Sequence, residues 1–530
     1  MRHIRFRESF ALGILLAATL LPQTSFGQTD PGVRRGTPGA GGAVAPIQVN
    51  ELAAFQEGLF RMTELEATCD GCSDVVAGTP SGQSPLLQTI TNSAGLGARF
   101  NGDQCVVCHS QPSLGGSGGF LVPNPKDSAS NFRAPENPMF SLIPRRNGAT
   151  NNVPSFIQQY GPIRELRLLR KPDGTPDGGV HQLFTIAGRT DDPTIPGCNA
   201  NVLPQPSFET EVQNKNVAYR IPLQEFGLGL IESIQDQEIL ARFNATVVQR
   251  ALLGIGGVPN RSGNDGTISR FGWKAQNKSL VMFAGEAYNV EMGVTNEVFP
   301  QAVEENDLCN GPKKAHPNDV MRTSTSDAQN EGFNNPLHMN ADWFQFTLFM
   351  RFLDGPKPVA LSTSAQRGKL LFGTVGCAAC HTPQMNTAPV MNTASLQNKP
   401  VNLYSDLLIH HMGPGLADHV TQGAASGDMF RTATLWGLGQ RMFFIHDGRT
   451  SDLMQAIAFH ASSACGGDNQ DGNSQGVSGP SSTNQNPNFG CNNLATGAAY
   501  GKSEANTVIG NFNALAVGDK QSILDFLRSL

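Results

Sequence analysis

Apolar residues recur at helical spacing in two parts of the chain that lie far apart. Residues Leu52 to Leu65 follow this spacing near the N-terminus. At the other end, four apolar residues fall at positions i, i+3, i+4 and i+7: Ile523, Phe526, Leu527 and Leu530. An apolar stripe of this kind predicts an amphipathic helix that packs against a core.

Between these segments the pattern is weaker. Residues 110 to 215 hold many Pro and Gly residues and few long periodic runs, which predicts a loop-rich insertion. Short strands are predicted inside it at Glu165 to Leu169 and at Gln182 to Ile186. Residues 28 to 48 are rich in Gly and Pro and are predicted to form a flexible leader.

The first 27 residues have the pattern of a secretory signal peptide. A basic start is followed by an apolar run from Phe10 to Leu21 and by small residues before a cleavage site near Gly27 and Gln28. The apolar run is too short to span a bilayer, and no Cys follows that could take a lipid. We therefore expect a periplasmic protein without stable membrane insertion.

The formal net charge is −6 over 530 residues, and signal removal would make it about −8. This charge argues against nucleic acid as a partner. A mildly acidic surface suits collision with a basic electron-transfer protein, although many soluble proteins are acidic for solubility alone.

Two C-x-x-C-H motifs carry the most specific chemistry in the sequence. The two thiols of such a motif attach a haem through thioethers, and the His that follows is the proximal ligand of the iron. A zinc site built from both Cys pairs is the alternative. It is disfavoured because a His follows each pair, because the pairs lie far apart, and because Phe100 and Phe372 each stand five residues before a motif. We predict two covalently bound haem c groups, held by Cys105, Cys108 and His109, and by Cys377, Cys380 and His381.

Six cysteines remain, and in an oxidising compartment they predict disulfides. Cys465 and Cys491 flank a tract rich in Gly, Ser, Asn and Gln, so we expect a disulfide between them. The other four could pair as Cys69 with Cys72 and Cys198 with Cys309, but the connectivity stays open.

The layout around the second motif predicts the fold class. Thr363 and Gln366 form a capping box before a helix over Arg367 to Phe372, which leads to Cys377. A helix before the motif and a closing amphipathic helix are typical of class I cytochrome c. We predict a mainly α-helical protein with two such haem domains: residues 49–350, with an insertion at about 110–265, and residues 351–530.

Several segments resemble bacterial di-haem cytochrome c peroxidases and, more closely, the di-haem oxidoreductase family, whose members are also called thiol oxidoreductases. The segments common to the peroxidases are Phe271 to Ala275, Glu291 to Gly293, Phe430 to Trp436 and His446 to Arg449; those closest to the second family are Phe100 to Gly102, His411 to Asp418 and again His446 to Arg449. This resemblance implies that peroxide binds at the haem on His109 and that electrons enter through the haem on His381.

The resemblance also implies roles for two further residues. Glu291 matches the family's catalytic glutamate, which takes a proton from one peroxide oxygen and delivers it to the leaving oxygen. Trp273 matches the tryptophan that lies between the haems. Without the resemblance, Glu291 would be a solvated carboxylate and Trp273 a core aromatic residue.

The iron on His381 needs a sixth ligand, and we predict His460 for it, with Met412 as the alternative. His460 ends a predicted helical run from Ser451, at the position where related peroxidases commonly place a Met. Two His ligands would give a lower potential than His and Met. No sixth ligand is indicated for the first haem. His446 is predicted to be structural, and Arg431 and Arg449 are candidates to neutralise haem propionates, or else surface charges.

Three functional classes remain open. They are a peroxidase that takes electrons from a small cytochrome or cupredoxin, a di-haem oxidase or oxygenase with another substrate, and a two-haem electron carrier. The sequence around Arg441 to Phe443 lacks the Thr-x-Pro that supplies part of the inter-haem calcium site in the peroxidases, so calcium is in doubt.

Overall fold

The computed structural model describes residues 28–66, 88–89, 95–119, 136–146, 149, 151–186, 205–301, 319–321, 340–465 and 491–530. The predicted signal peptide lies outside these residues, as do Cys69, Cys72, Cys198 and Cys309. The predicted disulfide between Cys465 and Cys491 is confirmed, with the two Cα atoms 5.3 Å apart.

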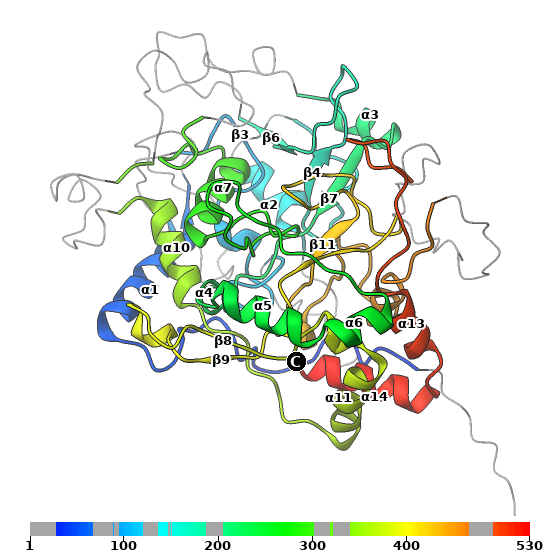
Figure 1. Ribbon diagram of the computed structural model, residues 1–530. Helices are drawn as coiled ribbons and strands as arrows, with labels where there is room; N and C mark the ends of the chain where they lie inside the picture. Colours follow the sequence, from blue (N-terminus) through cyan, green and yellow to red (C-terminus); the bar gives the residue numbers. More distant parts are fainter. Residues whose placement is uncertain are drawn as a thin grey trace, which may run out of the picture.

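The prediction of a mainly α-helical protein with two cytochrome c-like domains is wrong. Of the described residues, 33% are helical and 12% are in strands or bridges, and several small, mostly antiparallel sheets lie beside the helices (Figure 1). The chain contains 58 Gly and 34 Pro residues. These residues interrupt helical runs, and the short apolar segments between them pair as strands instead.

The helices include most of those that the apolar spacing predicts. The predicted N-terminal helix begins three residues earlier than expected and ends before a short strand, and the C-terminal helix is present. The helices are α1 (Val49–Met62), α2 (Pro138–Arg146), α3 (Phe208–Gln213), α4 (Leu228–Glu232), α5 (Asp236–Ala245), α6 (Val247–Leu253), α7 (Leu280–Met292), α10 (Asp342–Phe352), α11 (Thr363–Val375), α12 (Leu453–Ala458), α13 (Asn506–Asn513) and α14 (Val517–Ser529), with 3-10 turns η1 (Cys105–Val107), η3 (Cys377–Ala379), η4 (Ala394–Leu396) and η5 (Leu438–Gln440).

Within the described ranges, the strands are two to four residues long and form five small sheets. In the largest sheet, β4 (Glu165–Leu168) lies between β5 (Val180–His181) and β7 (Val217–Arg220), with Leu166 opposite both His181 and Tyr219. The other pairs are β1 (Glu64–Leu65) with β2 (Gln88–Thr89), which is parallel, and the antiparallel pairs β3 (Arg99–Phe100) with β6 (Phe184–Thr185), β8 (Met385–Asn386) with β9 (Pro400–Val401) and β10 (Ile409–His411) with β11 (Met429–Arg431).

Two helix pairs each cross at a glycine. Helices α1 and α10 pack at Gly58, where an added Cβ would collide with the carbonyl oxygen of Gln345. Helices α11 and α14 pack at Gly368, where a Cβ would collide with the backbone of Ser522 (Figure 1). Each crossing therefore requires a residue without a side chain, because the two backbones are in direct contact.

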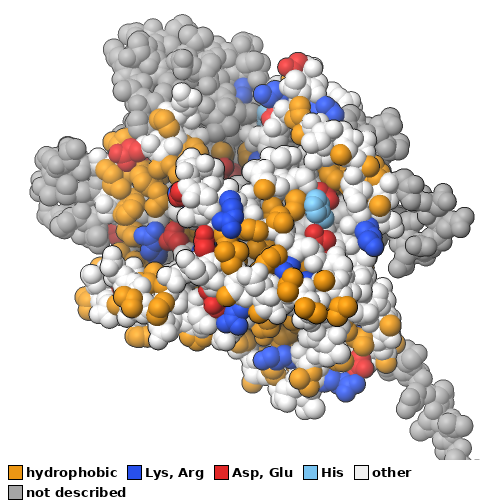
Figure 2. Space-filling model, in the orientation of Figure 1, with side chains coloured by type: hydrophobic (Ala, Val, Ile, Leu, Met, Phe, Trp, Pro, Cys, Tyr) orange, Lys and Arg blue, Asp and Glu red, His pale blue; other side chains and the backbone are white. Residues whose placement is uncertain are grey.

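The main apolar core draws on both halves of the chain. It combines Phe55 and Phe100 with residues from the second half such as Leu403 and Trp436. A separate core lies around the second C-x-x-C-H turn, between α11, α12 and α14. No helix in the described ranges is long and apolar enough to cross a membrane. Acidic and basic side chains are interspersed on the face that Figure 2 shows.

Candidate functional site

The first C-x-x-C-H turn borders a cavity of about 170 Å³. Cys105, Cys108 and His109 line one side of it, and Tyr288 and Glu291 of α7 line another. The Nδ1 atom of His109 lies 3.2 Å from the carbonyl oxygen of Gly116, which leaves Nε2 as the ring nitrogen available to a metal. The structure therefore brings Glu291 into the same cavity as His109, although the two residues lie far apart in the sequence.

Glu291 is held by the segment that carries the first motif. The Asn101 side chain donates a hydrogen bond to Oε2 of Glu291 at 2.9 Å, and the Asn101 backbone N–H donates to the Glu291 carbonyl at 2.6 Å. Burial, together with the neighbouring Glu165 carboxylate, raises the pKa of Glu291 to about 8. Near neutral pH this side chain can therefore both take up and release a proton.

The insertion supplies charged side chains to the first cavity, which the sequence did not indicate. Arg164, Glu165 and Arg167 come from β4 and the residue before it, and Arg220 comes from β7. Arg167 pairs with Glu165 at 2.7 Å. In the sequence these residues lie among proline- and glycine-rich stretches, which have no pattern that would place them together. Only the pairing of β4 with β7 shows that they line the same wall of the cavity.

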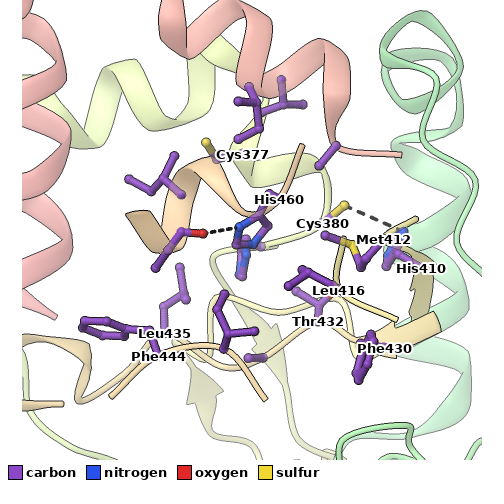
Figure 3. Close-up of a pocket in the computed structure, with 18 of the residues that line it drawn as sticks. Cys377, Cys380, His410, Met412, Leu416, Phe430, Thr432, Leu435, Phe444 and His460 are labelled. Carbon is purple, nitrogen blue, oxygen red and sulfur yellow. Dashed lines mark hydrogen bonds between the residues drawn. The ribbon is translucent and has the colours of Figure 1, made fainter. Parts of the chain in front are cut away.

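The second C-x-x-C-H turn borders a cavity of about 230 Å³ with a mainly apolar lining (Figure 3). Cys377, Cys380, His381 and His460 all line it. The Nδ1 atom of His381 lies 3.0 Å from the carbonyl oxygen of Tyr404, and that of His460 lies 2.8 Å from the carbonyl oxygen of Ala456. The ring centroids of His381 and His460 are 6.5 Å apart. This separation is about the span of two imidazoles that bind one metal ion from opposite sides at metal–nitrogen distances of about 2 Å.

The alternative ligand Met412 also lines the second cavity, but it lies beside Cys380 and His410 (Figure 3). His410 is occupied by two carboxylates: its Nδ1 lies 2.7 Å from Glu504 and its Nε2 lies 3.0 Å from Asp406. Among these candidates, His460 is the imidazole that stands across from His381.

Trp273 lines both cavities and is the only described residue that does. Its indole N–H donates to the carbonyl of Ile221 at 3.0 Å, and its ring packs beside Phe430 and Leu416. His446 lies edge-on to the indole and stacks on Phe430, with ring centroids 4.4 Å apart in the latter pair. Trp273 therefore lies between the two cavities, and Phe430 and His446 pack beside it where they line the second cavity.

A buried ammonium group lies next to this aromatic cluster. Lys274 is fully buried, and its Nζ contacts the carbonyl oxygens of Ser426 and Met429 at 2.9 and 2.8 Å and Oδ1 of Asp418 at 3.0 Å. Arg220 pairs with the same carboxylate at 2.7 Å. Nothing in the sequence around Lys274, which directly follows Trp273, indicates a buried structural cation.

Haem groups fit the residues that line the two cavities. Two thiols and one imidazole line each cavity, and the Nδ1 atom of each imidazole is hydrogen-bonded to a backbone carbonyl. The second cavity also has a mainly apolar lining. Arg431 and Arg441 line the second cavity and are buried, and burial lowers the pKa of each to about 10. Nη2 of Arg441 has no hydrogen-bond partner among the described residues, so it is suited to an anionic substituent such as a propionate.

The two arginines proposed from the sequence are placed differently. Arg431 lines the second cavity, whereas Arg449 lines neither cavity and pairs with Asp447 at 2.8 Å. Arg441 was not proposed from the sequence as a partner for a propionate, but it lines the second cavity. The Cζ atom of its guanidinium lies 5.9 Å from the centroid of the Trp273 ring.

Residues 181–472 match the protein family described as "Di-haem oxidoreductase, putative peroxidase". No curated protein matches the chain. Among solved structures, hydrazine synthase from Kuenenia stuttgartiensis, pressurised with xenon at 20 bar, is 16% identical with a TM-score of 0.19. That comparison covers 39% of this chain and 60% of the other. The family match spans more than half of the 530 residues, so the chain belongs to the di-haem oxidoreductase family.

Proposed function

We propose that this protein is a periplasmic di-haem c-type peroxidase that reduces hydrogen peroxide with electrons from a small redox protein. The observation that carries the proposal is Glu291, a carboxyl group with a raised pKa that faces the same cavity as the first C-x-x-C-H turn. The two motifs line separate cavities, which supports one haem at each motif rather than one zinc ion shared by both.

When bound, the two haems would supply redox-active iron, one for the reaction with peroxide and one for electron intake. His109 would hold the first haem, and His381 with His460 would hold the second. Glu291 takes a proton from one peroxide oxygen and gives it to the other, while the Asn101 amide keeps its carboxyl group in place. The Trp273 indole lies between the two cavities, where it provides an aromatic path for electrons.

Spin-resonance spectra of the oxidised protein, before and after partial reduction and peroxide addition, test the proposed function. We expect a high-spin ferric signal from the first haem that peroxide converts to a new species, because the described part of the chain shows no second imidazole opposite His109. The second haem should stay low-spin. Two low-spin haems that ignore peroxide at every stage would contradict a peroxidase and support an electron carrier.

The pKa of Glu291 predicts the pH dependence of peroxide turnover. The side chain must be a carboxylate to accept the first proton, and burial raises its pKa to about 8. The value of kcat/KM for peroxide should therefore rise with pH and level off above about pH 8. Initial rates over a range of pH values, compared with those of Glu291→Gln, check this. A profile that is flat through pH 8 would contradict it.

A further inference from the structure

The two proximal histidines differ in what surrounds their Nδ1 atoms. The Nδ1 atom of His381 is hydrogen-bonded to a neutral group, the carbonyl oxygen of Tyr404, at 3.0 Å. His109 has a carbonyl oxygen of Gly116 at 3.2 Å and, in addition, Oε1 of Glu225 at 3.7 Å. Within the described ranges no carboxylate pairs with His381 in this way. The first motif thus has an acidic neighbour that the second lacks.

Glu225 is fixed in this position by the loop that follows the first motif. Its backbone N–H donates to the carbonyl of Gly115 at 2.7 Å, and the Ser117 hydroxyl donates to the carbonyl of Pro222 at 2.6 Å. The Glu225 side chain is buried and lines the cavity of the first motif. These contacts join the segment 222–225 to the loop 115–117 and hold the carboxyl group beside His109.

The carboxyl group also has unused hydrogen-bonding capacity. Its Oε2 atom is buried and has no hydrogen-bond partner among the described residues. A buried carboxylate oxygen without a partner is costly, so a nearby N–H is a favourable partner for this group. The Nδ1–Oε1 distance of 3.7 Å is an ion-pair contact and is longer than a hydrogen bond, so the His109 N–H donates to Gly116 while the Glu225 carboxyl group lies next to it.

Resting on the proposed function, which places a haem on His109, we propose that Glu225 is a positioning residue for this ligand. The carboxylate beside Nδ1 holds the imidazole and makes it a stronger electron donor to iron, because a negative charge next to the N–H of a ligating histidine makes the ring more basic. A more basic ligand favours the oxidised metal. The first haem is therefore biased toward the ferric state relative to the second. This difference suits the first haem to reduce peroxide and the second to accept electrons.

The test is Glu225→Gln in the full-length protein with both haems attached. Spectroelectrochemical titration should show the ferrous-to-ferric ratio of the first haem rising at least tenfold at a fixed potential, which is a shift of about 59 mV for one electron. The potential of the second haem should not change. Resonance Raman spectra of the reduced protein should show a lower iron–histidine stretching frequency for the first haem alone.

Glu286→Gln is the matched control, because Glu286 lines the same cavity but bonds to Asn277. It should leave the iron–histidine frequency unchanged. Equal potential shifts in both variants with no change of frequency would overturn the proposal, since the effect would then be general electrostatics. An unchanged first haem in Glu225→Gln would overturn it as well. If that variant does not keep its haem, Glu225→Asp decides: a frequency identical to that of the wild type would overturn the proposal.

Failure of the proposed function gives a different result. If the wild-type protein carries no haem on the first motif, or if that haem ignores peroxide, the function is wrong whatever Glu225 does. Haem content of the purified protein and its response to peroxide are therefore measured before the variants are compared.

Discussion

Replacing Glu291 by Gln is expected to lower peroxide turnover by about 10²- to 10⁴-fold, which is the usual contribution of a positioned acid–base group. The amide keeps the shape of the side chain and a hydrogen bond with Asn101, but it cannot carry a proton between the peroxide oxygens. Haem content should stay at the wild-type level because Glu291 belongs to neither C-x-x-C-H motif, and the attachment uses the thiols of the motif. Steady-state peroxide reduction and the absorbance of the attached haem measure both quantities.

Glu286→Gln serves as the control for this experiment too. Glu286 lies on the same helix, α7, and lines the same cavity, so the substitution removes a similar carboxyl group from a neighbouring position. We expect it to change turnover much less than Glu291→Gln does. If the two variants lose activity equally, or if Glu291→Gln turns over peroxide at nearly the wild-type rate, Glu291 is not the proton carrier.

The second large effect is expected on stability, from Lys274→Met. The methionine would leave Arg220 as the remaining ion-pair partner of the Asp418 carboxylate and would remove one hydrogen-bond donor from each of the carbonyls of Ser426 and Met429. Breaking a buried ion pair from one side costs about 3–5 kcal/mol, because the remaining partner stays buried. A clearly lower guanidinium midpoint of unfolding, followed by haem absorbance and circular dichroism, would show this loss.

Lys278→Met is the matched control, four residues further along the chain. Lys278 also pairs with a carboxylate, that of Asp265, but the lysine side chain is 35% exposed and the aspartate side chain 42% exposed, whereas Lys274 and Asp418 are buried. Exposed ion pairs contribute little because water screens them. The midpoint of this variant should stay near that of the wild type. A loss in Lys278→Met as large as that in Lys274→Met would mean that burial of the ammonium is not what stabilises this region.

Residues in short local motifs could be identified from the sequence. The two C-x-x-C-H turns are defined by neighbours in the chain, and each forms a 3-10 turn at the edge of a cavity. The C-terminal helix and the disulfide between Cys465 and Cys491 were also predictable. In these cases the information is local, because helical spacing, turn geometry and the closing of one loop depend on few residues.

The fold class could not be inferred in the same way. Helices α11 and α14 do pack together, as the class I cytochrome c comparison suggested, and the strands β4 and β6 lie where short strands were predicted, but the other strands and the pairing into sheets were missed. Strands of two to four residues are too short for an alternating pattern to stand out from the surrounding loops. Their pairing depends on segments far apart in the sequence, such as β3 with β6.

The sequence by itself determined the type of chemistry, because it contains two thiol and imidazole sets suited to haem. The roles of Glu291 and Trp273 were indicated by the resemblance of their segments to di-haem peroxidases. Only the tertiary structure decided how these residues meet. It brings Asn101 to Glu291, Glu225 to His109 and the insertion's arginines to the first cavity. It also places Trp273 between both cavities and buries Lys274 beside it. The physical reason is that a motif specifies bonds between chain neighbours, whereas burial, ion pairing and cavity walls arise from contacts between distant segments.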